Sequence, residues 1–107
     1  MTIRDHHDKD TRDFIEGKRV RAFEQCASAA VKAITKLQAA ERLGDLRNPP
    51  SNNFEALVNE HGRYSIRIDR KWRVCFRWAP VGPHDEEIDV LMVRGEPYDV
   101  EISNHYD

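Results

Sequence analysis

Residues 62–78 read GRYSIRIDRKWRVCFRW, and this stretch decides the fold class of the chain. Apolar and polar residues alternate from Tyr64 to Ile68 and again from Trp72 to Trp78, on either side of a short polar turn. Alternation with a period of two around a turn predicts a β-hairpin with one buried face. A β-branched run over 88–93 and the residues 98–102 predict two further strands.

Two helices are predicted before this hairpin. Residues 8–17 begin with Asp and Thr side chains that can cap a helix and end on a glycine, which predicts a short helix. Apolar residues then recur at helical spacing, which predicts an amphipathic helix over about 19–42. Residues 46–53 contain two prolines and are predicted to form a non-helical loop. The element order predicts an α+β fold, with two N-terminal helices packed on an antiparallel sheet.

The length of 107 residues predicts a single domain spanning residues 1–107. No apolar run is long enough for a spanning helix or a signal peptide, so the chain is expected in the cytoplasm and away from membranes. Cys26 and Cys75 lie inside predicted regular elements, and we expect both to be reduced thiols in the core. The histidines and cysteines lack metal-ligand spacing and no phosphate-binding glycine motif occurs, so neither a metal nor a cofactor is expected.

The net charge of -2 conceals an uneven distribution of charge along the chain. Residues 1–84 carry 16 Lys/Arg and 11 Asp/Glu, whereas residues 85–107 carry one Arg and eight acids. Strand alternation predicts that Arg73 and Arg77 share the polar face of the hairpin and that Arg67 joins them from the neighbouring strand. Guanidinium groups in this arrangement suit phosphate, while the plain alternative is a solvated polar face. The acidic end of the chain either screens the basic body or is a solvated edge.

Several of these segments, in this order, resemble the HigB-type toxins of the RelE/ParE superfamily, also called plasmid-maintenance killer proteins. The resemblance rests on DLRNPP (45–50), FEAL (54–57), GRYSIRI (62–68), WRVCFRW (72–78) and the VEI (100–102) that precedes a His/Tyr pair. It implies a RelE-like, microbial-RNase-like fold and the toxin of a type II toxin–antitoxin pair. The implied activity is a ribosome-dependent, metal-independent endoribonuclease that cleaves mRNA and inhibits translation. The implied partners are the ribosome, mRNA and a helix-turn-helix antitoxin similar to HigA, through which alone operator DNA is bound.

The resemblance, together with the arginine pattern, gives a set of candidate site residues. The predicted catalytic residues are Arg73, Arg77, His105, Tyr106, Glu55 and His61. The predicted RNA-binding residues are Arg63, Arg67, Arg70 and Lys71. Many family members end in Asp-Tyr-His, whereas this chain has Asn104, His105 and Tyr106 at the aligned positions.

Two other functions remain open from the sequence. A ParE-like chain would poison DNA gyrase instead of cutting mRNA, and a RelE-fold chain without catalysis would act as a binding module. For the antitoxin contact, the sequence favours the loop and N-terminal region, with Phe14 and Ile15, since the long helix needs its apolar stripe for the core.

Overall fold

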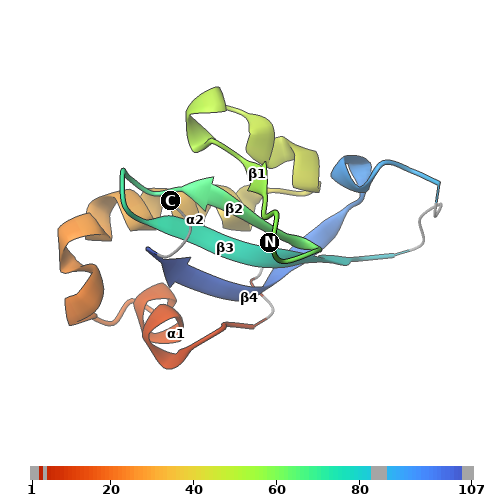
Figure 1. Ribbon diagram of the computed structural model, residues 1–107. Helices are drawn as coiled ribbons and strands as arrows, with labels where there is room; N and C mark the ends of the chain where they lie inside the picture. The colour runs from red at the N-terminus through yellow and green to blue at the C-terminus, as the bar shows by residue number, and fades with distance from the viewer. Residues whose placement is uncertain (1–2, 4, 83–86, 105–107) are drawn as a thin grey trace.

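The computed structural model describes residues 3, 5–82 and 87–104, and one antiparallel sheet forms its centre (Figure 1). The strands lie in chain order across the sheet: β1 (Glu55–Ala56), β2 (Arg63–Arg67), β3 (Arg73–Pro80) and β4 (Gly95–Ser103). Tyr64 lies opposite Phe76 and Ile66 opposite Val74, as alternation of the two strands requires. The predicted α+β class and the predicted hairpin are therefore confirmed.

Two α-helices precede the sheet, α1 (Lys9–Ile15) and α2 (Ala27–Ala39). The Asp8 carboxylate caps α1 by accepting a hydrogen bond from the backbone N–H of Thr11 at 2.8 Å. The buried stripe of α2 packs with the apolar side chains of β2 and β3 in one core that includes Ala33, Ile34, Leu37, Ile66, Val74 and Phe76. Hydrophobic burial of this stripe is what holds the helices to the sheet.

The long helix predicted over 19–42 is shorter and begins differently. Residues Arg21–Cys26 form a 3₁₀ helix, η1, and the α-helical part ends at Ala39. Ala40 adopts extended backbone and is itself buried, so packing of this residue draws the chain out of the helix. The segment predicted as a non-helical loop also contains short 3₁₀ turns, η2 (Leu43–Arg47) and η3 (Pro50–Asn52). Proline at the first helical position explains the second turn, because that position needs no N–H donor.

The strand predicted over 88–93 is wrong. Val90–Met92 form a 3₁₀ turn, η4, which Asp89 caps by accepting a hydrogen bond from the N–H of Leu91 at 3.0 Å. Pairing with β3 begins only at Gly95, and the last strand therefore spans nine residues instead of the predicted 98–102. The local cap overrides the strand propensity of the β-branched run.

Phe14 and Ile15 serve the core. The Phe14 ring packs edge-on against Phe23, with ring centroids 5.8 Å apart, and Ile15 packs against the main cluster. Both side chains are half-buried, so part of their apolar area is used inside the protein, and the predicted antitoxin contact stays a prediction. None of the helices in the described part of the chain is long and apolar enough to cross a membrane.

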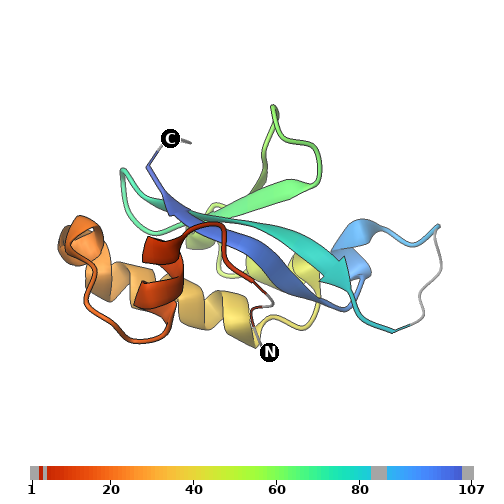
Figure 2. The ribbon, with the colours of Figure 1, turned by 90° about the horizontal axis from the view of Figure 1, so that it is seen from below.

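The helices cover only one face of the sheet. Figure 2 shows α1 and α2 beneath the sheet, while loop 57–62 and the end of the described chain lie on the other side. The face away from the helices carries the polar side chains of the alternating strands and is referred to below as the arginine face.

Candidate functional site

The arginine face is built by the polar positions of β2 and β3. In the hairpin register Arg63 lies opposite Arg77, and Arg67 lies opposite Arg73. Side chains directly opposite each other in a sheet lie on the same face. The prediction that Arg67, Arg73 and Arg77 share one face is therefore confirmed, and Arg63 lies on it as well.

Arg73 is held in place by neutral acceptors. Its side chain is almost fully buried; Nε donates to Ser65 Oγ at 2.8 Å and Nη2 to the carbonyl oxygen of Asn53 at 2.5 Å. Hydrogen bonds to uncharged oxygens fix the orientation of a guanidinium without cancelling its charge. Arg73 is thus a positioned cation suited to an anionic group.

Arg63 has a different environment, although it lies on the same face. It is 2% exposed, and its guanidinium contacts Asp99 through Nη1 and Glu101 Oε1 through Nη2 at 3.0 Å. Its Nε lies 3.4 Å from Glu60 Oε2. Three carboxylates around one buried guanidinium make Arg63 the centre of an ion-pair cluster. These carboxylates, unlike the neutral acceptors of Arg73, already balance the charge of Arg63, and its predicted role in RNA binding stays a prediction.

The environment of Arg77 is intermediate between those of Arg73 and Arg63. It is about one-third exposed; Nη1 donates to the carbonyl oxygen of His61 at 3.1 Å and Nε lies 3.4 Å from Asp99 Oδ2. The loop before β2 therefore fixes one end of this guanidinium and Asp99 the other. The exposed edge of Arg77 is open to a ligand on the arginine face.

Asp99, on β4, links the N-terminal segment to the ion-pair cluster around Arg63. The register of β3 and β4 shifts between Cys75 and Arg77, and Asp99 has a positive φ of 52° at that shift. Its other carboxylate oxygen accepts a hydrogen bond from His7 Nδ1 at 2.8 Å. Burial opposes ionisation of Asp99, but His7 and Arg63 outweigh it, so the pKa of this carboxyl is lowered.

His7 is a part of the site that the sequence did not indicate. Besides the contact with Asp99, its Nε2 lies 3.9 Å from Glu101 Oε1. The hydrogen bond to Asp99 raises the pKa of His7, against the opposing effects of partial burial and of Arg63. No sequence pattern links positions 7 and 99, because they come together only in the folded protein. Across the described residues, no group of three or more His, Cys, Asp or Glu side chains is arranged to hold a metal ion.

The acidic end of the chain thus folds against the basic hairpin. Glu101 and Asp99 come from the segment that carries the excess of acids, and both contact Arg63. Of the two alternatives for this segment, screening of the basic body is the one that the ion pairs support.

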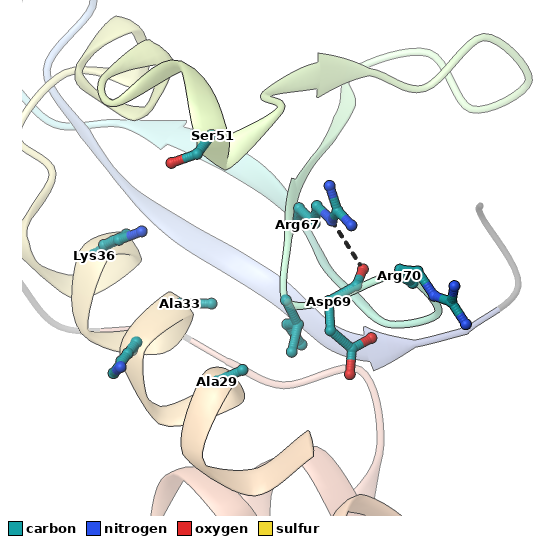
Figure 3. A pocket seen from close by; sticks show the side chains of 9 residues that line it. Ala29, Ala33, Lys36, Ser51, Arg67, Asp69 and Arg70 are labelled. Atoms are coloured by element: carbon teal, nitrogen blue, oxygen red, sulfur yellow. Dashed lines mark hydrogen bonds between the residues drawn. The ribbon is translucent and has the colours of Figure 1, made fainter. Parts of the chain in front are cut away.

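A second basic surface lies beside the arginine face, between α2 and the β2–β3 turn. The hollow there has a volume of about 440 Å³ and is lined by four cations, Lys32, Lys36, Arg67 and Arg70, over a floor that includes Ala29 and Ala33. Figure 3 shows the Arg67 guanidinium held by the backbone oxygen of Asp69, a hydrogen bond of 3.2 Å. The Asp69 carboxylate caps the turn by accepting hydrogen bonds from the N–H groups of Lys71 and Trp72. The hollow continues the positive charge of Arg67 away from the arginine face.

The match to known proteins covers most of this architecture. Residues 4–91 match the family model described as RelE-like toxin of type II toxin-antitoxin system HigB. The chain belongs to this HigB-like toxin family. The matched range contains all the arginines of β2 and β3, whereas β4, with Asp99 and Glu101, lies beyond it.

Two relatives are similar to parts of this HigB-like chain. Over 53 residues it is 40% identical to Toxin HigB-1 of Vibrio cholerae serotype O1 (strain ATCC 39315 / El Tor Inaba N16961). The aligned stretch covers 49% of this chain and 56% of that protein. Over 70 residues it is 26% identical to an uncharacterized protein of Haemophilus influenzae (strain ATCC 51907 / DSM 11121 / KW20 / Rd), 64% of each. The chain therefore spans less than two thirds of the length of these two relatives.

The HigB-like fold brings some of the remaining candidate residues to the arginine face. Glu55 is exposed on β1 opposite Ser65, so it lies on the same face as Arg73. His61 is exposed in the loop before β2, where its backbone positions Arg77. His105 and Tyr106 lie outside the described residues. Cys75 also lies on this face, but burial raises the pKa of its thiol to about 12, which keeps it protonated and unreactive.

Proposed function

We propose that this HigB-like toxin is an endoribonuclease that cuts mRNA on the ribosome and so inhibits translation, with no metal ion in the reaction step. The observation that carries the proposal is the fixed orientation of Arg73 and Arg77 on one face of the sheet. A guanidinium presents paired N–H donors that fit the oxygens of a phosphate. Two such groups on a rigid support suit one phosphodiester and the additional charge that develops on it during cleavage.

The proposed reaction uses the ribose of the substrate as its nucleophile. A general base, for which Glu55 and His61 are the described candidates, accepts the proton of the 2′-hydroxyl, and the 2′-oxygen attacks the adjacent phosphorus. The bond from phosphorus to the 5′-oxygen breaks, and that oxygen takes up a proton from an acid. The products are a 2′,3′-cyclic phosphate and a 5′-hydroxyl. General acid and general base catalysis each contribute roughly 10²–10⁴-fold.

The remaining candidates have supporting roles in this proposal. Arg67 lies beside Arg73 and extends the phosphate path toward the basic hollow, where Arg70 and Lys71 of the β2–β3 turn meet the RNA strand. Arg63 acts by positioning the acidic residues, and His61, His105 and Tyr106 are alternative proton-transfer groups. Charge of this kind supports RNA binding without sequence preference.

The test uses purified chain, ribosomes programmed with a defined mRNA, and primer extension to map cuts. The chain is expected to cut the mRNA, and Arg73→Ala is expected to lower the rate by about 10²-fold or more, the scale for loss of one donor to a developing anion. Arg21→Ala is the matched control, because Arg21 is exposed on η1 at the helical side. Binding to ribosomes without cutting would leave the non-catalytic module. If the chain instead arrests the growth of bacteria while mRNA stays intact and DNA breaks accumulate, the function as a gyrase poison is supported.

We also propose that the partner is a helix-turn-helix antitoxin, since antitoxins accompany toxins of type II systems. We propose further that operator DNA is bound through this antitoxin alone. If the antitoxin leaves the arginine face uncovered, Arg73→Ala is expected to change its affinity by less than about 1 kcal/mol in calorimetry. A loss of several kcal/mol would mean that the antitoxin covers the arginine face directly.

A further inference from the structure

One carboxylate connects an imidazole to the arginine face. Asp99 Oδ1 accepts a hydrogen bond from His7 Nδ1 at 2.8 Å, and Asp99 Oδ2 contacts both Arg63 and Arg77. A single carboxylate thus separates the His7 ring from the guanidinium that is proposed to hold the phosphate. About half of the His7 side chain is exposed, so the ring is open to a ligand on this face.

The N-terminal segment is placed there by backbone pairing with β4. His7 N–H donates to the carbonyl oxygen of Val100 at 2.7 Å, and Val100 N–H donates to the carbonyl oxygen of Asp5 at 3.3 Å. The Asp5 carboxylate also accepts a hydrogen bond from the N–H of Asp99. The imidazole is therefore attached to the edge of the sheet by the same strand that carries its carboxylate partner.

The backbone at Asp99 is unusual in a way that serves this contact. Between Tyr98 and Glu101 the strand accommodates an extra residue, and Asp99 adopts a positive φ of 52°. Residues other than glycine rarely adopt this conformation, and such residues concentrate at functional sites, as do β-bulges. The bulge directs the Asp99 carboxylate toward His7 on one side and the arginines on the other.

We propose that His7 is the general acid of the cleavage reaction and that Asp99 is its positioning residue, an inference that rests on the endoribonuclease proposed above. The 2′-hydroxyl proton passes to the general base as the 2′-oxygen bonds to phosphorus. As the bond to the 5′-oxygen breaks, His7 Nε2 gives its proton to that oxygen. The neutral imidazole then recovers a proton from water, and the Asp99 carboxylate stays ionised throughout.

An in-line displacement sets a geometric demand on the two proton-transfer groups. The base must lie on the side of the attacking oxygen and the acid on the side of the leaving oxygen. His7 lies along β4, at the edge of the sheet away from β1, and Asp99 holds its ring beside Arg77, which assigns His7 to the leaving-oxygen side of a phosphodiester held by this arginine. A dyad of His and Asp also fixes the tautomer, because Nδ1 donates to the carboxylate and Nε2, 3.9 Å from Glu101 Oε1, is the nitrogen left for the substrate.

The charges around His7 favour its protonated form. Asp99 and Glu101 on β4 raise its pKa, while partial burial and Arg63 on β2 oppose this, and the net direction is upward. Asp5 on its own segment accepts a hydrogen bond from the N–H of Asp99, and Arg77 on β3 contacts the Asp99 carboxylate. A raised pKa keeps an imidazolium available as a proton donor near neutral pH.

The decisive variant is His7→Asn, because an Asn side-chain NH₂ can replace Nδ1–H toward Asp99 but cannot supply a titrating proton. Single-turnover cleavage of ribosome-bound mRNA is measured against pH. Wild type is expected to slow as pH rises through the His7 pKa. His7→Asn is expected to be about 10²–10⁴-fold slower, the range for loss of one general acid, and to lack this alkaline decline. His6→Asn is the control, since His6 pairs with Val100 through its backbone.

A substrate with sulfur in place of the 5′-oxygen separates chemistry from structure. A thiolate leaves without protonation, so His7→Asn is expected to cut this substrate at nearly the wild-type rate. Equal slowing on both substrates would give His7 a structural role and overturn the inference, as would a variant within threefold of wild type on normal mRNA. Absence of cutting by the wild-type chain would instead overturn the endoribonuclease itself. Thermal unfolding of His7→Asn checks that the variant is folded.

Discussion

Replacement of Arg63 by Met is the most informative change to the stability of this fold. The guanidinium is 2% exposed and contacts Asp99, Glu101 and Glu60, so its loss leaves carboxylates facing one another without the cation that balances them. Removal of one partner from a buried ion pair costs about 3–5 kcal/mol. Asp99 and Glu101 keep side-chain exposures of 29% and 17%, so water reaches them in part and the lower end, about 3 kcal/mol, is expected.

Urea unfolding at pH 7 measures this loss. Since small domains unfold with only about 5–15 kcal/mol, the expected decrease is large. Arg67→Met is the control: Arg67 is exposed and its guanidinium is held by a backbone oxygen, so less than about 1 kcal/mol is expected. Combining Arg63→Met with Asp99→Asn and Glu101→Gln should restore most of the stability, because the two less exposed carboxylates of the cluster then carry no charge, while Glu60 is 37% exposed and stays in contact with water. A loss below about 1 kcal/mol for Arg63→Met, or no recovery in the triple variant, would refute this reasoning.

Three further predictions concern pH and packing. The His7–Asp99 pair should stabilise the fold only within a pH window. The raised pKa of His7 gives a stabilising contribution that is present below its usual 6.5 and is lost as pH rises through the folded pKa. The lowered pKa of Asp99 gives a stabilising contribution that is present above 3.8 and is lost as pH falls through the folded pKa. The stability difference between wild type and His7→Asn, from urea unfolding across pH, should therefore be largest between these limits and shrink on both sides; a flat difference would contradict it. Ser65→Ala removes the acceptor of Arg73 Nε and should slow mRNA cutting about tenfold, the equivalent of one hydrogen bond of about 1.4 kcal/mol, with ribosome binding unchanged. Gly95→Ala should destabilise the fold by about 1–3 kcal/mol in thermal unfolding, because a Cβ there would lie 2.5 Å from both the backbone oxygen and the indole nitrogen of neighbouring β3 residues.

The sequence predicted the parts of the fold that local periodicity controls. Alternation over 64–78 gave the hairpin and the shared face of Arg67, Arg73 and Arg77, because the side-chain period of a strand is two whatever surrounds it. Local patterns failed where a cap or a packing contact decides the outcome. The β-branched run at 88–93 forms a turn because the Asp89 carboxylate caps it, and no strand propensity encodes that competition.

The site was predictable in its cations but not in its carboxylates. Arg63 and Arg67 are both arginines at polar positions of the same alternating strand, yet Arg63 is buried in an ion-pair cluster and Arg67 is exposed. The difference depends on the register and the bulge of β4, which begins 32 residues after Arg63 in the chain. The contact of His7 with Asp99 spans 92 positions and exists only in the folded protein.

These environments predict opposite consequences for two arginines on one face. Arg73 donates to neutral oxygens, so its charge is available to a phosphate and its loss should impair cutting more than folding. Arg63 is already matched by Asp99 and Glu101, so its loss should impair folding first, and activity only through the misplaced carboxylates. The acids of β4 therefore do more than lower the net charge, because they decide which of the four arginines can act on a substrate.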